Sequence, residues 1–246
     1  IKFFSEQVFN LDRAEVLLEM IALDLILRDP PYLQVAIDVI DLSKAVKIAN
    51  AVAISEKVII EAGTPLIKSV GIDSVRIFSQ MFPNNIIFAD MKTMDVGALE
   101  VEMALSAGAK IVSVLGAADE QTIIESSKKA KELGGEVQVD MISVLDPLNR
   151  AKKVRELGVN IVGLHAGIDQ QLGKRLRGVD FIPLVKELKK EIDDIKISVA
   201  GGIKPDEAKK LAEAGTDIIV AGSFITNSKE PREATKLFLK ELGINP

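Results

Sequence analysis

The chain has 246 residues, of which 48% are hydrophobic and 4% aromatic, and it contains one histidine and no cysteine. These counts exclude disulfides, thiolate-bound zinc, iron–sulfur clusters, a cysteine nucleophile and any metal site that needs two imidazoles. The 31 Lys and Arg against 36 Asp and Glu give a net charge of -5, which argues against nucleic-acid binding and favours small-molecule partners. A metal would be held mainly by carboxylates, which is typical of magnesium.

Residues 1–32 precede the first predicted strand and are expected to form an N-terminal helical extension. The stretch Leu11–Leu27 follows Asn10, a candidate N-cap, and carries apolar residues at helical spacing. This helix would close the amino end of the fold or cover a subunit interface, with a lid over the site as the alternative. Its most apolar part, Val16–Leu27, is too short to span a bilayer, is broken by Glu19 and Asp24, and lacks a basic leader, so we expect a cytoplasmic protein without membrane partners.

Eight short apolar runs follow, and each is the continuous run of Val, Ile, Leu and Ala that is typical of a parallel strand buried on both faces. The runs are Leu33–Val39, Val58–Ala62, Ile86–Met91, Ile111–Leu115, Val137–Ile142, Ile161–His165, Lys196–Ala200 and Ile218–Ala221. Amphipathic patterns such as Asp119–Leu133 separate them and predict helices.

Three connections between these elements nearly repeat one another. Each places a glycine, Gly108, Gly158 or Gly215, where a helix must end before the next strand. Eight strand–helix units, with glycines of this kind between them, predict an α/β fold, a closed (βα)₈ TIM barrel over residues 33–246. An open sheet with many strands is the alternative, and no further domain boundary is expected.

Charged residues interrupt the apolar runs at strand ends, where a (βα)₈ barrel places its active site. They are Asp38 on the first strand, Glu61 on the second, Asp90 and Lys92 on the third, Asp140 on the fifth and His165 on the sixth. Lys92 is the most informative, because an unpaired lysine at the end of a buried strand is costly to desolvate. His165 suits proton transfer because an imidazole exchanges protons near neutral pH. Asp140 could equally be a cap or turn residue.

The seventh and eighth strands end instead in the pairs Gly201-Gly202 and Gly222-Ser223. Exposed backbone N–H groups at this place bind a phosphate in many barrels, with simple turn formation as the alternative. Carboxylates on one side and a phosphate cradle on the other predict a sugar-phosphate substrate.

The segment Asp90-Met91-Lys92-Thr93-Met94-Asp95 has a D-x-K-x-x-D pattern that resembles the orotidine-phosphate decarboxylase superfamily. Further segments are similar to its 3-hexulose-6-phosphate synthase branch in order and spacing, from about Leu33 to the end of the chain. They are Glu61–Lys68, Leu115–Asp119, His165–Asp169 and Val199–Ile203.

Single positions choose among the members of this superfamily. Glu61 stands where the metal-independent decarboxylases carry a lysine, and the lone histidine disagrees with ribulose-phosphate epimerases, which use two. Ile168 stands where 3-keto-L-gulonate-6-phosphate decarboxylase carries an arginine. The resemblance therefore favours the aldolase, a carbon–carbon lyase, with that decarboxylase as the enzyme alternative. An inactive phosphate-binding barrel or scaffold is the non-enzyme alternative.

The resemblance implies a magnesium-dependent reaction, with manganese as the alternative metal, that joins formaldehyde to D-ribulose 5-phosphate. The product would be D-arabino-3-hexulose 6-phosphate, formed reversibly through an enediolate. The roles implied are Glu61 and Asp90 as metal ligands, Lys92 as a positive charge compensated by Asp90 and Asp95, His165 as the proton carrier, Asp38 as a partner of Lys92 or of a substrate hydroxyl, and Asp140 and Asp169 as further candidates. The family's last motif aspartate reaches the neighbouring subunit's site, so Asp95 implies a homodimer.

Overall fold

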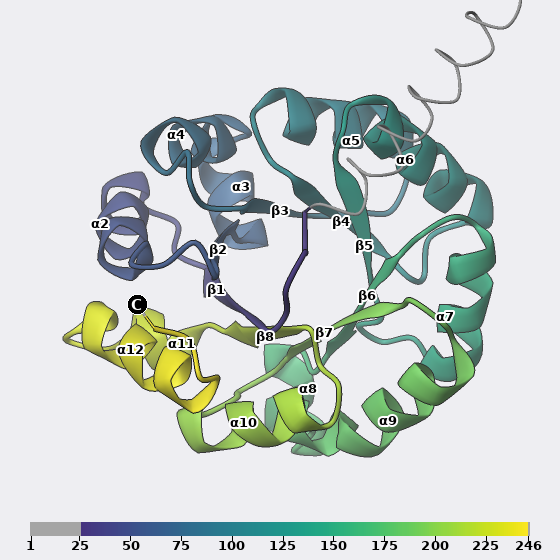
Figure 1. Cartoon of the computed structure of the whole chain (residues 1–246). Coiled ribbons are helices and arrows are strands. Elements are labelled where there is room, and N and C mark those ends of the chain that lie inside the picture. Colours follow the sequence, from purple (N-terminus) through teal and green to yellow (C-terminus); the bar gives the residue numbers. More distant parts are fainter. Residues whose placement is uncertain (1–25, 246) are drawn as a thin grey trace, which may run out of the picture.

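The computed structural model describes residues 26–245 as a closed barrel of eight parallel strands in sequence order, with β8 paired to β1. Figure 1 looks along this barrel, and the helices form an outer ring around the strands. The strands are β1 (Tyr32–Ile37), β2 (Val58–Ala62), β3 (Ile87–Thr93), β4 (Ile111–Leu115), β5 (Glu136–Asp140), β6 (Ile161–His165), β7 (Lys196–Ala200) and β8 (Ile218–Ala221). The predicted (βα)₈ barrel is confirmed.

The helices follow the strands and begin at recognisable caps. Asp41 accepts the Lys44 N–H at 2.6 Å at the start of α2, and Asp119 accepts the Gln121 N–H at 2.8 Å at the start of α6. The helices are α2 (Leu42–Val52), α3 (Thr64–Val70), α4 (Asp73–Met81), α5 (Gly97–Ser106), α6 (Glu120–Glu132), α7 (Pro147–Glu156), α8 (Ile168–Lys174), α9 (Ile182–Glu191), α10 (Pro205–Glu213), α11 (Ser223–Thr226) and α12 (Pro231–Glu241), with a 3₁₀ turn η1 (Gly178–Phe181) before α9.

The strands β2, β4, β6, β7 and β8 have the predicted bounds, whereas β1, β3 and β5 differ from prediction. Strand β1 ends at Ile37, so Asp38 follows the strand instead of closing it. Strand β5 ends at Asp140 because its carboxylate accepts the Ile142 N–H at 2.8 Å and Ser143 turns the chain at φ 60°. Strand β3 continues to Thr93 past an irregularity described below.

The three repeated connections end as predicted. Gly108, Gly158 and Gly215 have φ values of 103°, 87° and 105°, a region that residues with a side chain rarely adopt. Each glycine thus turns the chain from a helix into the following strand.

Alternate strand residues point into the barrel, and the strand register stacks them in layers. The lowest layer consists of four fully buried isoleucines, one from each even-numbered strand: Ile59, Ile111, Ile161 and Ile218. Above it lie Gln34, Phe88, Gln138 and Ser198 from the odd-numbered strands, and then Glu61, Ser113, Gly163 and Val220 from the even-numbered ones. The interior therefore changes from apolar to polar toward the carboxyl ends of the strands.

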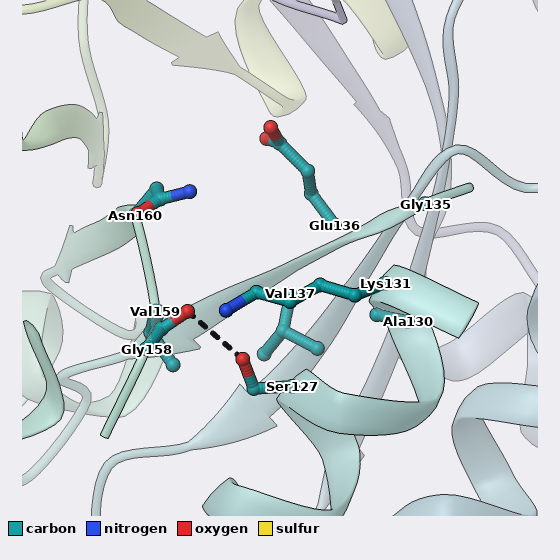
Figure 2. Close-up of a pocket in the computed structure, with 9 residues that line it drawn as sticks. All are labelled: Ser127, Ala130, Lys131, Gly135, Glu136, Val137, Gly158, Val159 and Asn160. Atoms are coloured by element: carbon teal, nitrogen blue, oxygen red, sulfur yellow. Dashed lines mark hydrogen bonds between the residues drawn. The ribbon is translucent and has the colours of Figure 1, made fainter. Parts of the chain in front are cut away.

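A small hollow lies at the amino ends of two strands. Figure 2 shows a pocket of about 10 Å³ at the start of β5 and β6, where Ser127 Oγ donates a 2.9 Å hydrogen bond to the Gly158 carbonyl. A space of that size holds about one water molecule. This hollow is therefore too small for a sugar phosphate.

The predicted helix Leu11–Leu27, and with it most of the N-terminal extension, lies outside the described residues. Within residues 26–245, no helix is long and apolar enough to cross a membrane.

Candidate active site

A pocket of about 1170 Å³ opens at the carboxyl ends of the strands and reaches down to Gln34, Phe88 and Gln138. Every residue predicted for the site except Asp95 lines it. These are Asp38, Glu61, Asp90, Lys92, Asp140, His165, Asp169, Gly201, Gly202, Gly222 and Ser223.

Lys92 owes its position to an irregularity in β3. The register with β4 shifts between Ala89 and Thr93, and Lys92 itself has φ 48°. Its N–H donates to Ser113 Oγ at 2.9 Å, a side-chain acceptor on β4. A residue other than glycine in this backbone region stores strain of the kind that collects at functional sites.

The Lys92 ammonium joins two buried carboxylates. Its Nζ lies 2.5 Å from Asp90 Oδ2 and 3.6 Å from Asp140 Oδ2. Burial by itself lowers the pKa of Lys92, but the charges of Asp90 and Asp140 and the hydrogen bond to Asp90 outweigh it and raise the pKa above its usual range. Lys92 therefore carries a fixed positive charge in the pocket.

Two hydroxyl groups that the sequence analysis missed orient Asp90. Ser113 Oγ donates to Asp90 Oδ1 and Thr64 Oγ1 donates to Asp90 Oδ2, both at 2.7 Å. A signal for Ser113 was present in the sequence, because it is the single polar residue of an otherwise apolar strand. With Lys92, these donors hold the Asp90 carboxylate in one orientation.

Asp140 links Lys92 to His165. Its Oδ2 lies 2.9 Å from His165 Nδ1, and its Oδ1 accepts the Ile142 N–H. Burial tends to raise the pKa of Asp140, but the hydrogen bond and charge of His165, then the charge of Lys92, lower it below its ordinary value. Asp140 is thus a charged member of the site, and it orients the imidazole.

Glu61 is buried beneath Asp90, with 5% of its surface exposed. Gln34 Nε2 donates to Glu61 Oε2 at 2.6 Å. Burial, reinforced by the negative charges of Asp90 and Asp38, raises the pKa of Glu61 well above its ordinary value. The ionised carboxylate therefore lacks sufficient positive charge around it.

Asp38 lies at the pocket rim just after β1. Only a glycine at position 63 leaves room for its carboxylate, because a Cβ there would collide with Asp38 Oδ1. Loss of water around the carboxylate and the charge of Asp90 raise the pKa of Asp38. Within residues 26–245 it forms no hydrogen bond to Lys92, so Asp140 takes the place beside Lys92 that was expected for Asp38 or Asp95.

The oxygen-rich side of the pocket fits a hard divalent cation. Asp38, Glu61 and Asp90 bring three carboxylates together around one ammonium group, which leaves an excess of negative charge. Within the described part of the chain, no three His, Asp or Glu side chains are placed to hold a metal by themselves. Magnesium suits this arrangement, since it commonly takes one or two protein carboxylates and completes its shell with water and substrate oxygens.

The opposite side of the pocket presents backbone groups. Across residues 26–245, the N–H groups of Gly201, Gly202, Gly222 and Ser223 have no hydrogen-bond acceptor. Arg177, which the sequence analysis missed, donates to the Gly202 carbonyl at 2.6 Å and to Glu207 Oε2 at 2.8 Å, and so fixes this loop from outside. Free N–H groups after the last two strands are suited to a phosphate.

The two remaining predicted residues lie at the periphery. Asp169 is an exposed residue in the first turn of α8, on the pocket rim. Asp95 is exposed outside the pocket, and its Oδ1 accepts the Val96 N–H at 2.8 Å. The expected pairing of Asp95 with Lys92 is therefore not found within one chain.

The family model described as "Orotidine 5'-phosphate decarboxylase / HUMPS family" matches residues 31–238. The chain belongs to this family. The predicted resemblance to its 3-hexulose-6-phosphate synthase branch is confirmed, since the 3-hexulose-6-phosphate synthase of Mycobacterium gastri is 41% identical over 83% of the chain and 96% of that protein. A crystal structure of a 3-hexulose-6-phosphate synthase aligns with a TM-score of 0.81 and 37% identity, covering 86% of the chain and all of that structure.

Some relatives are longer than the family domain. The bifunctional enzyme Fae/Hps of Methanothrix thermoacetophila is 38% identical over 87% of the chain but only 53% of that protein. The chain therefore spans about half the length of these bifunctional relatives.

Proposed function

We propose that this family member is a magnesium-dependent aldolase, a carbon–carbon lyase that joins formaldehyde to D-ribulose 5-phosphate and catalyses the reverse cleavage. The product is D-arabino-3-hexulose 6-phosphate. The observation that carries the proposal is the chain of contacts Asp90–Lys92–Asp140–His165, which faces free backbone N–H groups across one pocket. The names of the relatives at about 40% identity support it. The proposal includes a cytoplasmic site of action, which cell fractionation would test.

The pocket divides the substrate between its two sides. The phosphate binds the loops that follow β7 and β8, which directs the carbonyl end of the sugar toward Glu61, Asp90 and Lys92. His165 takes the proton from C1, and Asp140 holds the imidazole in place and compensates the charge it gains. The resulting enediolate is negative, and the fixed charge of Lys92 stabilises it.

Glu61 and Asp90 are the residues that would hold magnesium. When bound, the ion supplies positive charge beside the enediolate oxygens. Asp38, which has no hydrogen-bonded partner among the described residues, is free to accept a substrate hydroxyl.

We also propose a homodimer in which Asp95 of each subunit reaches the other subunit's pocket. Asp95 lies outside its own pocket, and the large apolar residues Met94, Val96 and Leu99 around it are more than half exposed. Mixing inactive Asp95→Ala and His165→Ala chains tests this, because a shared site would recover part of the activity. Failure of mixed dimers to recover activity would contradict it.

The deciding experiment measures formaldehyde consumption with ribulose 5-phosphate, with and without magnesium and chelator. We expect turnover that chelation abolishes and magnesium restores. Carbon dioxide release from a 3-keto-hexonate phosphate would instead favour the decarboxylase, although Ile168 offers no cation for its carboxylate. Phosphate binding without exchange of the C1 proton would indicate an inactive barrel.

A further inference from the structure

Two glutamines occupy the same layer inside the barrel, Gln34 on β1 and Gln138 on β5. Both are buried, with 2% and 6% of their surface exposed, and neither amide oxygen has a hydrogen-bond partner within residues 26–245. An unpaired buried polar group costs about 1–3 kcal/mol. A native barrel that keeps two such groups calls for a reason.

Gln34 is explained by its neighbour. Its amide nitrogen donates to Glu61, one layer higher on the adjacent strand β2. Reversing the amide would place its oxygen against the carboxylate. Gln34 therefore positions Glu61.

Gln138 lies beside β6 as Gln34 lies beside β2, but no side chain on β6 accepts a hydrogen bond from its amide. Its amide nitrogen extends toward β6, where Gly163 occupies the layer that Glu61 occupies on β2. A Cβ at Gly163 would lie 2.7 Å from Gln138 Nε2, so the glycine leaves the space that the amide fills. Within the described chain, this nitrogen has no hydrogen-bond acceptor.

Gln138 lines the pocket below Asp140, two residues earlier on β5 and on the same inward face. Strands β2 and β6 are four apart in a ring of eight and lie on opposite sides of the barrel (Figure 1). Gly163 on β6 therefore lies across the barrel from Glu61 on β2. Gln138, Lys92 and His165 line the same pocket. Lys92 is already bound to Asp90 and approached by Asp140. Among residues 26–245, the uncommitted donors deep in the pocket are therefore neutral, namely the Gln138 amide and the Ser198 hydroxyl of the same layer.

A neutral N–H donor at this place suits a carbonyl oxygen that becomes negative during reaction. The proposed function already assigns the phosphate to the β7 and β8 loops and the enediolate to the carboxylate side. The group left without a donor is the aldehyde. We propose that the side-chain amide of Gln138 binds the carbonyl oxygen of the aldehyde substrate, an inference that rests on the proposed function.

The step that Gln138 assists is the formation of the carbon–carbon bond. C1 of the enediolate bonds to the aldehyde carbon, the C1–C2 double bond is replaced by a carbonyl at C2, and the aldehyde π electrons move to its oxygen. That oxygen receives the proton removed earlier from C1 and becomes the new hydroxyl group. Gln138 donates a hydrogen bond throughout and transfers no proton.

The test uses Gln138→Met, which keeps the length of the side chain and removes its N–H groups. Exchange of the C1 hydrogen of ribulose 5-phosphate with deuterated solvent, followed by NMR without formaldehyde, should stay within about twofold of wild type. The kcat/KM for formaldehyde at saturating ribulose 5-phosphate should fall by about 100- to 1000-fold, as for loss of one oxyanion donor. Ser198→Ala removes the other neutral donor of the same layer and should change neither rate, whereas a selective loss for formaldehyde in this variant would assign the aldehyde to Ser198 instead.

A second variant leaves Gln138 itself intact. Gly163→Ala places a methyl group against Nε2 and should displace the amide, with the same loss for formaldehyde and the same preserved exchange. Thermal unfolding of each variant checks that it is folded.

Three outcomes overturn the inference. One is an unchanged kcat/KM for formaldehyde in folded Gln138→Met or Gly163→Ala. Another is a fall in C1 exchange that parallels the fall in aldol rate, since Gln138 would then act on the sugar. The third is a wild-type enzyme that exchanges no C1 hydrogen with solvent, which would contradict the proposed function itself. This result can be told apart from the other two because it is obtained without any variant.

Discussion

The two halves of the barrel mouth present different chemical groups, charged side chains on one half and backbone N–H groups on the other. Strands β1 to β3 supply charged side chains, with Glu61 and Asp90 buried and Asp38 at the rim, whereas β7 and β8 end in glycines that present backbone N–H groups. Asp140 lies between them and joins Lys92 to His165. The proposed enediolate chemistry therefore uses charged side chains that repel one another, whereas the proposed phosphate site uses backbone N–H groups that glycine leaves accessible.

The largest expected effect is the loss of turnover when the charged half of the site loses Lys92. Lys92→Ala removes the fixed positive charge beside the enediolate and should raise the barrier by about 3 kcal/mol or more, a loss of over about a hundredfold in kcat. Steady-state turnover measures this. Lys152→Ala, an exposed lysine paired with Glu191, is the control and should be unchanged. Near-normal turnover of the Lys92 variant would exclude the assigned role.

Glu61→Gln tests whether the charged half is held against repulsion. The amide is isosteric but neutral, so binding of Mn²⁺, measured by electron paramagnetic resonance without substrate, should weaken by at least about tenfold. Because burial and neighbouring charge raise the pKa of Glu61, the variant should also be more stable to thermal unfolding. A less stable variant would show that the charge is well compensated.

Gly201→Ala addresses the backbone half. Gly201 has φ 127°, and an added Cβ would lie 2.6 Å from Ala166 Cβ, so the loop must move. We expect the KM for ribulose 5-phosphate to rise by about tenfold with a smaller change in kcat. Gly134→Ala, at φ 68° with open space around its Cβ position, imposes backbone strain without a collision. Equal effects of the two variants would argue against a phosphate loop at Gly201.

The smallest effect concerns the residue that joins the halves. The pKa of Asp140 is lowered in the folded chain, so its ionised form contributes stability that is present above the ordinary pKa of 3.8 and lost as the pH falls through the lowered value. The free energy of unfolding of wild type should therefore approach that of Asp140→Asn as the pH falls from about 5 to about 3. Urea unfolding at a series of pH values measures the difference. A difference that does not change with pH would contradict the assigned interactions.

The fold could be predicted from the sequence because buried parallel strands are continuous apolar runs. Each run can be recognised from its own residues, without knowing which strands lie beside it. It predicted the charged residues because a carboxylate or lysine within such a run is costly. The irregular end of β3 was missed, since a positive φ at Lys92 leaves no mark in the residue pattern.

The sequence analysis also did not single out the neutral polar residues inside the barrel. Gln34 and Gln138 lie two residues before Ala36 and Asp140 on the same inward face, so alternation along the strands could have identified them. Their hydrogen bonds could not be foreseen, because these depend on which strand lies beside which. In the proposed homodimer the place of Asp95 depends on a second subunit, about which one chain carries little information.

The backbone at Lys92 has a consequence for how this barrel could be stabilised. At φ 48° a glycine would relax where lysine is strained, by roughly 1 kcal/mol. Lys92→Gly would nonetheless destabilise the barrel, because Asp90 and Asp140 would stay buried without the ammonium group beside them. The ion pairs that place the ammonium group in the pocket thus also hold the strained end of β3 in its conformation.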